Sequence, residues 1–142
     1  MSETIKKLTK EFEDIIKGLG LKFVTYGRGG KLVTKVYIPD EGWHYFTSLD
    51  GSYESARETM LLLLQEQLKE ELAKRLNWEF GIDGRLQGNY ISVAIYLTRK
   101  KTILVDFYFP HSEEPIATVR MERLDLQQLE QILRQADAWG VL

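Results

Sequence analysis

The chain has 142 residues, of which 44% are hydrophobic and 28% are charged, with a formal net charge of −2 and no cysteine. This length predicts one domain, residues 1–142, with enough apolar content to bury a core without disulfides. The missing cysteines exclude thiolate metal sites and cysteine nucleophiles, and the charge gives no overall attraction to nucleic acid or anionic membranes.

Residues 3–18 predict an amphipathic helix, because apolar residues recur on one stripe and opposite charges lie four apart on the other side. The segment lacks the continuous apolar run of a signal peptide. The longest apolar run, MLLLL at 60–64, is far shorter than a membrane span. We therefore expect a cytoplasmic protein.

Two strands, 21–26 and 31–38, are predicted around the turn GRGG, and 43–49 predicts a third short strand. A long helix is then predicted over 52–76. Its apolar residues form a row at a spacing of four. Such a row drifts around the helix, so we expect the helix to cross its neighbours at an angle. The row consists of Ala56, Met60, Leu64, Leu68, Leu72 and Leu76. Because residues 61–64 are apolar on every side, we expect the first half of this helix to be deeply buried.

The second half of the chain predicts more strands and a final helix. Residues 77–88 contain a short strand before the turn Asp83-Gly84, and a long hairpin follows over 88–110. Residues 117–121 predict another strand, and Asp125 with Gln128 caps a last helix that ends at Gly140. The order α-β-β-(β)-α-β-β-β-α predicts an α+β fold with three helices and a mainly antiparallel sheet of about five to six strands.

The hairpin over 88–110 predicts its own register. Apolar residues alternate from Ile91 to Leu97 and again from Ile103 to Phe109. These two sets face each other only if the numbers of opposed residues have an even sum. We therefore predict a turn of three or five residues, although glycine, which three-residue turns favour, is missing. A three-residue turn at 99–101 pairs Leu97 with Ile103, Ile95 with Val105, Val93 with Phe107 and Ile91 with Phe109.

Tyrosines and phenylalanines alternate onto opposite faces of both hairpins. If the hairpins share one sheet, its phenylalanine face (Phe23, Phe107 and Phe109) packs under three helices. Its second face carries tyrosines, whose rings bury well while their hydroxyls stay hydrated, as protein interfaces require. The predicted partner-binding residues are Tyr26, Tyr37, Tyr90, Tyr96 and Tyr108, with Lys35 and Arg99, and with Trp43 and Tyr45 at the margin.

Three interpretations of the tyrosine face stay open. It is a half-hydrated sheet on which tyrosines only pack against one another, a contact surface for a second copy or another protein, or a site for single-stranded nucleic acid. The last would use the tyrosines with Lys22, Lys35 and Arg99. We expect a non-enzymatic protein-interaction domain, chaperone-like or regulatory and homodimeric. The alternative is a single-stranded nucleic-acid-binding protein.

No motif predicts catalysis, a cofactor or a metal. YGRGG precedes a strand, whereas a phosphate loop precedes a helix. A metal site would need both histidines, His44 and His111, together with a carboxylate such as Glu113. His44 or Asp106 could act as a general acid or base in any cleft, but hydrogen bonding to Tyr or Arg would also explain Asp106. We therefore expect no enzyme activity and no cofactor.

Four segments resemble, in order and pattern, the type III secretion chaperone-like superfamily, including its sensory-transduction-regulator branch. They are IIKGLGLKFV (15–24), KLVTKVYI (31–38), WHYFTSL (43–49) and DLQQLEQILRQADAW (125–139). The resemblance implies a small α+β domain that is often dimeric and acts by binding other proteins. It assigns a role to no single residue.

Overall fold

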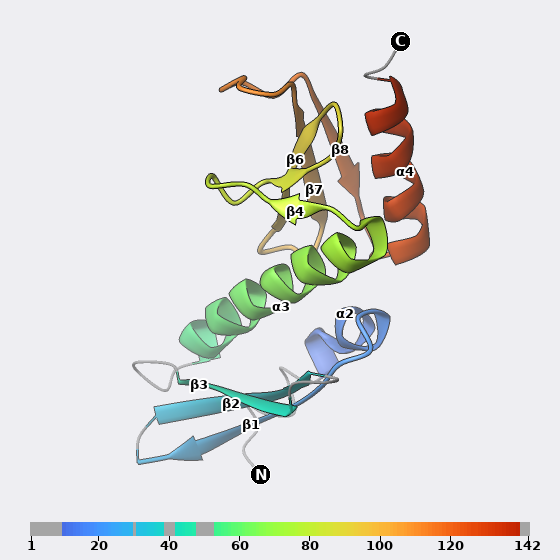
Figure 1. Ribbon diagram of the computed structural model, residues 1–142. Helices are drawn as coiled ribbons and strands as arrows, with labels where there is room; N and C mark the ends of the chain where they lie inside the picture. Colours follow the sequence, from blue (N-terminus) through green and yellow to red (C-terminus); the bar gives the residue numbers. More distant parts are fainter. Residues whose placement is uncertain (1–9, 30, 39–41, 48–52, 140–142) are drawn as a thin grey trace. The chain divides into compact units, whose positions relative to one another are not determined.

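The computed structural model describes residues 10–29, 31–38, 42–47 and 53–139. The α+β class is confirmed, and the helices and strands follow the predicted order except that the segment 77–88 contributes two short strands, β4 and β5 (Figure 1). The elements are α2 (Glu13–Gly18), β1 (Lys22–Arg28), β2 (Lys31–Ile38), β3 (Gly42–Thr47), α3 (Tyr53–Leu76), β4 (Glu79–Phe80), β5 (Leu86–Gln87), β6 (Ser92–Leu97), β7 (Ile103–Tyr108), β8 (Ala117–Met121) and α4 (Leu126–Trp139).

The strands form two antiparallel sheets, β1-β2-β3 and β4-β5-β6-β7-β8. The chain divides into two compact units, residues 1–64 and 65–142, and the boundary falls inside α3. The expectation that both hairpins share one sheet is therefore wrong, because the long helix α3 separates them along the chain and each pairs only within its own unit. Whether the whole chain unfolds as the single domain predicted above stays a prediction.

In the first unit, β1 and β2 form a hairpin, and Gly29 in its turn has a φ of 60°. Glycine adopts this left-handed conformation without steric cost, as two-residue hairpin turns require. The register pairs Val24 with Lys35 and Tyr26 with Val33, so these four residues share one face of the sheet. The third predicted strand is confirmed as β3, which pairs with β2.

The helical part of the first unit is anchored by Phe12, whose side chain is fully buried. Arg57 in α3 lies 5.6 Å above the Phe12 ring and forms a 2.6 Å ion pair with Glu11. Of the helix predicted over 3–18, residues 10–11 and 13–18 are helical, and residues 3–9 lie outside the described part of the chain.

In the second unit, the predicted hairpin register is confirmed: Leu97 pairs with Ile103 and Val93 with Phe107. The turn has three residues, 99–101, and is closed by a 2.9 Å hydrogen bond from Thr98 N to Thr102 O. Lys101 has a φ of 66° at the position that usually holds glycine. The β4–β5 turn repeats these hydrogen bonds and has Gly84, with a φ of 80°, at the matching position.

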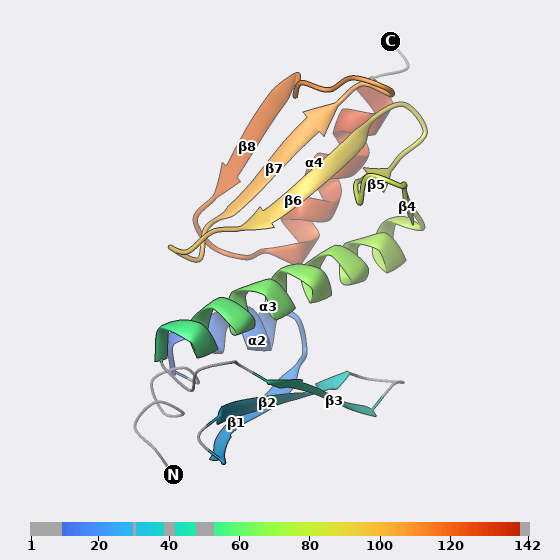
Figure 2. The same cartoon turned by 90° about the vertical axis from the view of Figure 1, so that its left-hand side faces the viewer.

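The core of the second unit lies between one face of its sheet and α4, which Figure 2 shows against β6, β7 and β8. Leu129 and Leu133 of α4 and Val105 of β7 are fully buried. The predicted cap of α4 is confirmed, because Asp125 Oδ1 accepts a 3.0 Å hydrogen bond from Gln128 N. The C-terminal limit predicted for this helix, Gly140, lies outside the described residues.

The apolar row of α3 is confirmed as buried from Met60 to Leu76. Leu62, however, has an exposed fraction of 63%, so the expectation that 61–64 is buried on every side is wrong at this residue. An α-helix has 3.6 residues per turn, so four consecutive residues point in all directions around it. One of the four side chains therefore points away from the core even in a fully apolar run.

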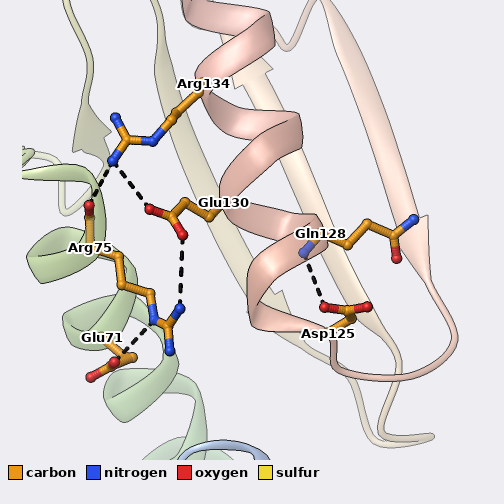
Figure 3. A network of polar contacts seen from close by, with 6 residues as sticks. All are labelled: Glu71, Arg75, Asp125, Gln128, Glu130 and Arg134. Atoms are coloured by element: carbon orange, nitrogen blue, oxygen red, sulfur yellow. Dashed lines mark hydrogen bonds and ion pairs between the residues drawn. The ribbon is translucent and has the colours of Figure 1, made fainter.

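The C-terminal end of α3 is tied to α4 by a network of polar contacts (Figure 3). Arg75 lies between Glu71, at 3.1 Å, and Glu130, at 3.8 Å. Arg134 donates to Arg75 O at 2.7 Å and contacts Glu130 Oε1 at 3.1 Å. The Arg134 guanidinium thereby satisfies a main-chain carbonyl in the last turn of α3, where intrahelical donors run out.

Candidate functional site

The residues predicted as one tyrosine surface divide between the two units. Tyr26 and Tyr37 lie in β1 and β2, whereas Tyr90, Tyr96 and Tyr108 lie in or beside β6 and β7. The reason is the separation of the hairpins into two sheets. The structure therefore presents two faces, and each is described by itself.

The face of the first unit contains an exposed aromatic cluster. Tyr37 pairs with Trp43 across β2 and β3, and the two ring centroids lie 5.5 Å apart with an interplanar angle of 65°. Lys35 Nζ lies 4.7 Å from the centroid of the Trp43 ring. The exposed fractions are 40% for Tyr37 and 43% for Trp43. Edge-to-face and cation–π contacts favour this arrangement before any partner arrives.

Other exposed residues extend this cluster along β1. Val24 is exposed and pairs with Lys35, and Tyr26 is half-buried two residues further on. We call Val24, Tyr26, Lys35, Tyr37 and Trp43 the aromatic–basic face. Trp43, which the sequence placed at the margin, stands directly beside Tyr37 in the ladder. Tyr45 is the ladder partner of Lys35.

The charged residues in the described strands of the aromatic–basic face have one sign. Lys22 and Arg28, at the two ends of β1, are both exposed. Neither they nor Lys35 form an ion pair with any other residue that the structure describes. The sequences of β1, β2 and β3 contain no Asp or Glu. This sheet therefore presents positive charge that no described carboxylate neutralises.

The tyrosines of the second unit are less uniform. Tyr90 and Tyr96 have exposed fractions of 44% and 43%, but Tyr108 is buried, at 7%. The Arg85 guanidinium covers the Tyr108 ring at 3.5 Å from its centroid. Tyr108 therefore offers little surface to a partner. Arg99 is exposed in the three-residue turn.

Asp106 lies on the same face of the second sheet as the tyrosines. Its Oδ1 accepts a 2.6 Å hydrogen bond from Thr118 Oγ1 on β8, the residue opposite it in the ladder. The sequence prediction named Tyr or Arg as the partner, and the observed partner is Thr. The bond links Asp106 of β7 to the neighbouring strand β8.

A polar recess of about 350 Å³ adjoins Arg85 and was not predicted from the sequence. Arg85 donates to Ser112 O at 3.0 Å and lies 3.5 Å from Asp83. His111, which also lines the recess, has a φ of 64° in the turn after Pro110. Within the described part of the chain, no three His, Asp or Glu side chains are placed to hold a metal ion.

An apolar groove of about 430 Å³ lies between α4 and the ends of β7 and β8. Phe107 and Phe109 both line it. Phe107 is buried as predicted, but Phe109 is 53% exposed, so its predicted place in the core is wrong. The ladder of β6 and β7 ends at Ser92 and Tyr108, and the predicted pairing of Ile91 with Phe109 does not form. The cause is Pro110, which restricts Phe109 and cannot itself donate to a ladder.

The chain matches no protein-family model, no curated protein and no solved structure. The resemblance to the type III secretion chaperone-like superfamily therefore stays a prediction. None of the helices in the described residues is long and apolar enough to cross a membrane.

Proposed function

We propose that the chain is a non-enzymatic protein-interaction domain and that its aromatic–basic face holds the partner. The observation that carries this proposal is the exposed cluster of Tyr37, Trp43 and Lys35. A few buried residues carry most of the binding free energy at protein interfaces, and Trp and Tyr are enriched among them. Two such rings exposed side by side on one sheet face offer this free energy to an incoming surface.

The cluster is also suited to binding because its side chains already contact one another. Immobilising a flexible side chain at an interface costs roughly 0.5–1.5 kcal/mol. Tyr37 and Trp43 pack edge to face, and Lys35 is drawn to the Trp43 ring, so part of this cost is met within the free chain. The partner is either a second copy, as expected from the sequence, or a different protein.

Single-stranded nucleic acid is the second candidate, and one observation favours it. Lys22, Arg28 and Lys35 stand beside exposed aromatic rings on a sheet without acidic residues. Proteins that hold single strands combine aromatic stacking with a positively charged groove. The net charge of −2 for the whole chain weighs against this candidate.

A displayed library of random 12-residue peptides tests the proposal, with the full chain as bait. Selected peptides are measured by fluorescence anisotropy against Tyr37→Ala/Trp43→Ala. The matched control is Tyr90→Ala/Tyr96→Ala, which removes two equally exposed rings from the second unit. We expect the first variant to weaken binding at least tenfold and the control to leave it unchanged. Failure to select any peptide that depends on Tyr37 and Trp43 would contradict the proposal.

A further inference from the structure

We infer that the partner presents an acidic segment in extended conformation to the aromatic–basic face. This inference rests on the proposed function and names the chemistry of the partner. Its basis is charge complementarity: Lys22, Arg28 and Lys35 are paired with no described carboxylate, and the three strands contain no acidic residue. The chain as a whole is negative, so this sheet differs in sign from the rest of the molecule.

The positions of the cations indicate an extended segment. Lys22 and Arg28 begin and end β1, and a strand rises about 3.3 Å per residue, so the two residues lie about 20 Å apart along it. Lys35 stands between them, opposite Val24. An extended chain of about six residues covers the same length and presents every second side chain to one face. Among the side chains at positions i, i+2 and i+4, which all point to the sheet, acidic ones would meet the cations and apolar ones would meet the rings.

A second copy fits this face poorly. A two-fold symmetric dimer places the same patch on both sides of the interface. Lys22, Arg28 and Lys35 would then face the same three cations, and such like-charge contacts cost several kcal/mol at an interface. An acidic segment of another protein meets no such cost.

Nucleic acid is also disfavoured by the geometry of the rings. Bases stack in succession on aromatic rings whose faces are open and parallel to them. Tyr37 and Trp43 are inclined by 65° to each other, and one face of Trp43 carries Lys35 Nζ. Inclined rings form pockets for side chains, and these suit a peptide better than a run of stacked bases.

The amino-acid composition of the selected peptides tests the inference. We expect acidic and apolar residues to be enriched together at every second position, i, i+2 and i+4, with no selection at the positions between them. A fluorescein-labelled peptide from the selection should bind at least tenfold more weakly to Lys35→Glu than to the natural chain. The control Lys100→Glu, which reverses an exposed charge in the turn of the second unit, should leave binding unchanged. Lys35→Met, which keeps the aliphatic stem, should weaken binding less than Lys35→Glu does.

Each other outcome contradicts the inference in a distinct way. Neutral or basic peptides that still require Trp43 would overturn the acidic partner while the proposed function stands. Peptides independent of Trp43 would overturn both. If a labelled oligo(dT) 12-mer binds more tightly than the selected peptide, and if Lys35→Glu abolishes this binding, the face would be assigned to nucleic acid. A dimer in light scattering that Tyr37→Ala/Trp43→Ala converts to a monomer would assign it to a second copy.

Discussion

Removing the carboxylate of Asp137 should destabilise the second unit more than the loss of any exposed charge. Asp137 lies in α4 and is buried. Its oxygens accept main-chain hydrogen bonds from Asn89 at 3.0 Å, Tyr90 at 2.7 Å and Ile91 at 3.1 Å. Three consecutive N–H groups thus form a nest around one carboxylate, which holds the loop before β6 against the helix.

The magnitude follows from these three bonds. A hydrogen bond to a charged group contributes about 1.5–3 kcal/mol. Asn89 and Tyr90 are exposed, so water can replace Asp137 at two of the N–H groups, whereas the Ile91 N–H is buried. We therefore expect Asp137→Ala to lower the free energy of unfolding by about 3–4 kcal/mol, near the upper end of the range for single substitutions. This corresponds to a fall in Tm of roughly 10 °C for a chain of this size.

Thermal and urea denaturation measure the loss, and amide hydrogen exchange locates it. The isosteric variant Asp137→Asn keeps one acceptor oxygen and should lose about half as much. Exchange should accelerate most at residues 89–91. A fall in unfolding free energy below about 1 kcal/mol for Asp137→Ala would show that the nest contributes little and would refute this reasoning.

Three smaller effects follow from the turn, the cap and the exposed ion pair. Lys101→Gly should raise the free energy of unfolding by up to about 1 kcal/mol in urea denaturation, because glycine relieves the positive φ; a lower stability would contradict this. Asp125→Ala should lower it by about 1 kcal/mol through loss of the α4 cap, and an unchanged midpoint would speak against the cap. The hydrogen bond and charge of Lys17 hold the pKa of Glu13 below its ordinary value, so the stabilisation from this pair is present at neutral pH and is lost as pH falls through that lowered pKa. In an NMR titration, Lys17→Ala should raise the Glu13 midpoint, and an unmoved midpoint would exclude the pair as its cause.

Local patterns in the sequence predicted the elements, and in the hairpin over 88–110 they also predicted the register. The alternation through Val93 and Phe107 left one pairing that buries both strands, and that pairing forms. This pairing forms although its three-residue turn places Lys101 at a positive φ, a conformation that is unfavourable for lysine. The cap at Asp125 was likewise predictable, because Asp125 and its partner Gln128 are only three residues apart in the chain.

What the sequence did not predict depends on contacts between distant segments. Alternation predicts which face of its own hairpin Tyr37 or Tyr96 lies on. It does not predict whether the two hairpins join one sheet. Tyr108 follows the same alternation and is nevertheless covered by Arg85, which lies in another strand connection. Gly88 is a further case: a Cβ at this position would lie 2.7 Å from Asp137 Oδ1, a contact set by a helix far along the chain. Only the fold shows why glycine stands there.

The most direct test of the central claim is a charge exchange across the proposed interface. Two peptides are compared: an acidic peptide selected on the natural chain, and a version of it in which the Glu nearest Lys35 is replaced by Lys. Each peptide is titrated against the natural chain and against Lys35→Glu. Direct pairing predicts that each single reversal weakens binding at least tenfold and that the two together restore it, since coupling appears only between residues in contact. If the two reversals weaken binding independently, without any restoration, the aromatic–basic face does not hold the acidic segment.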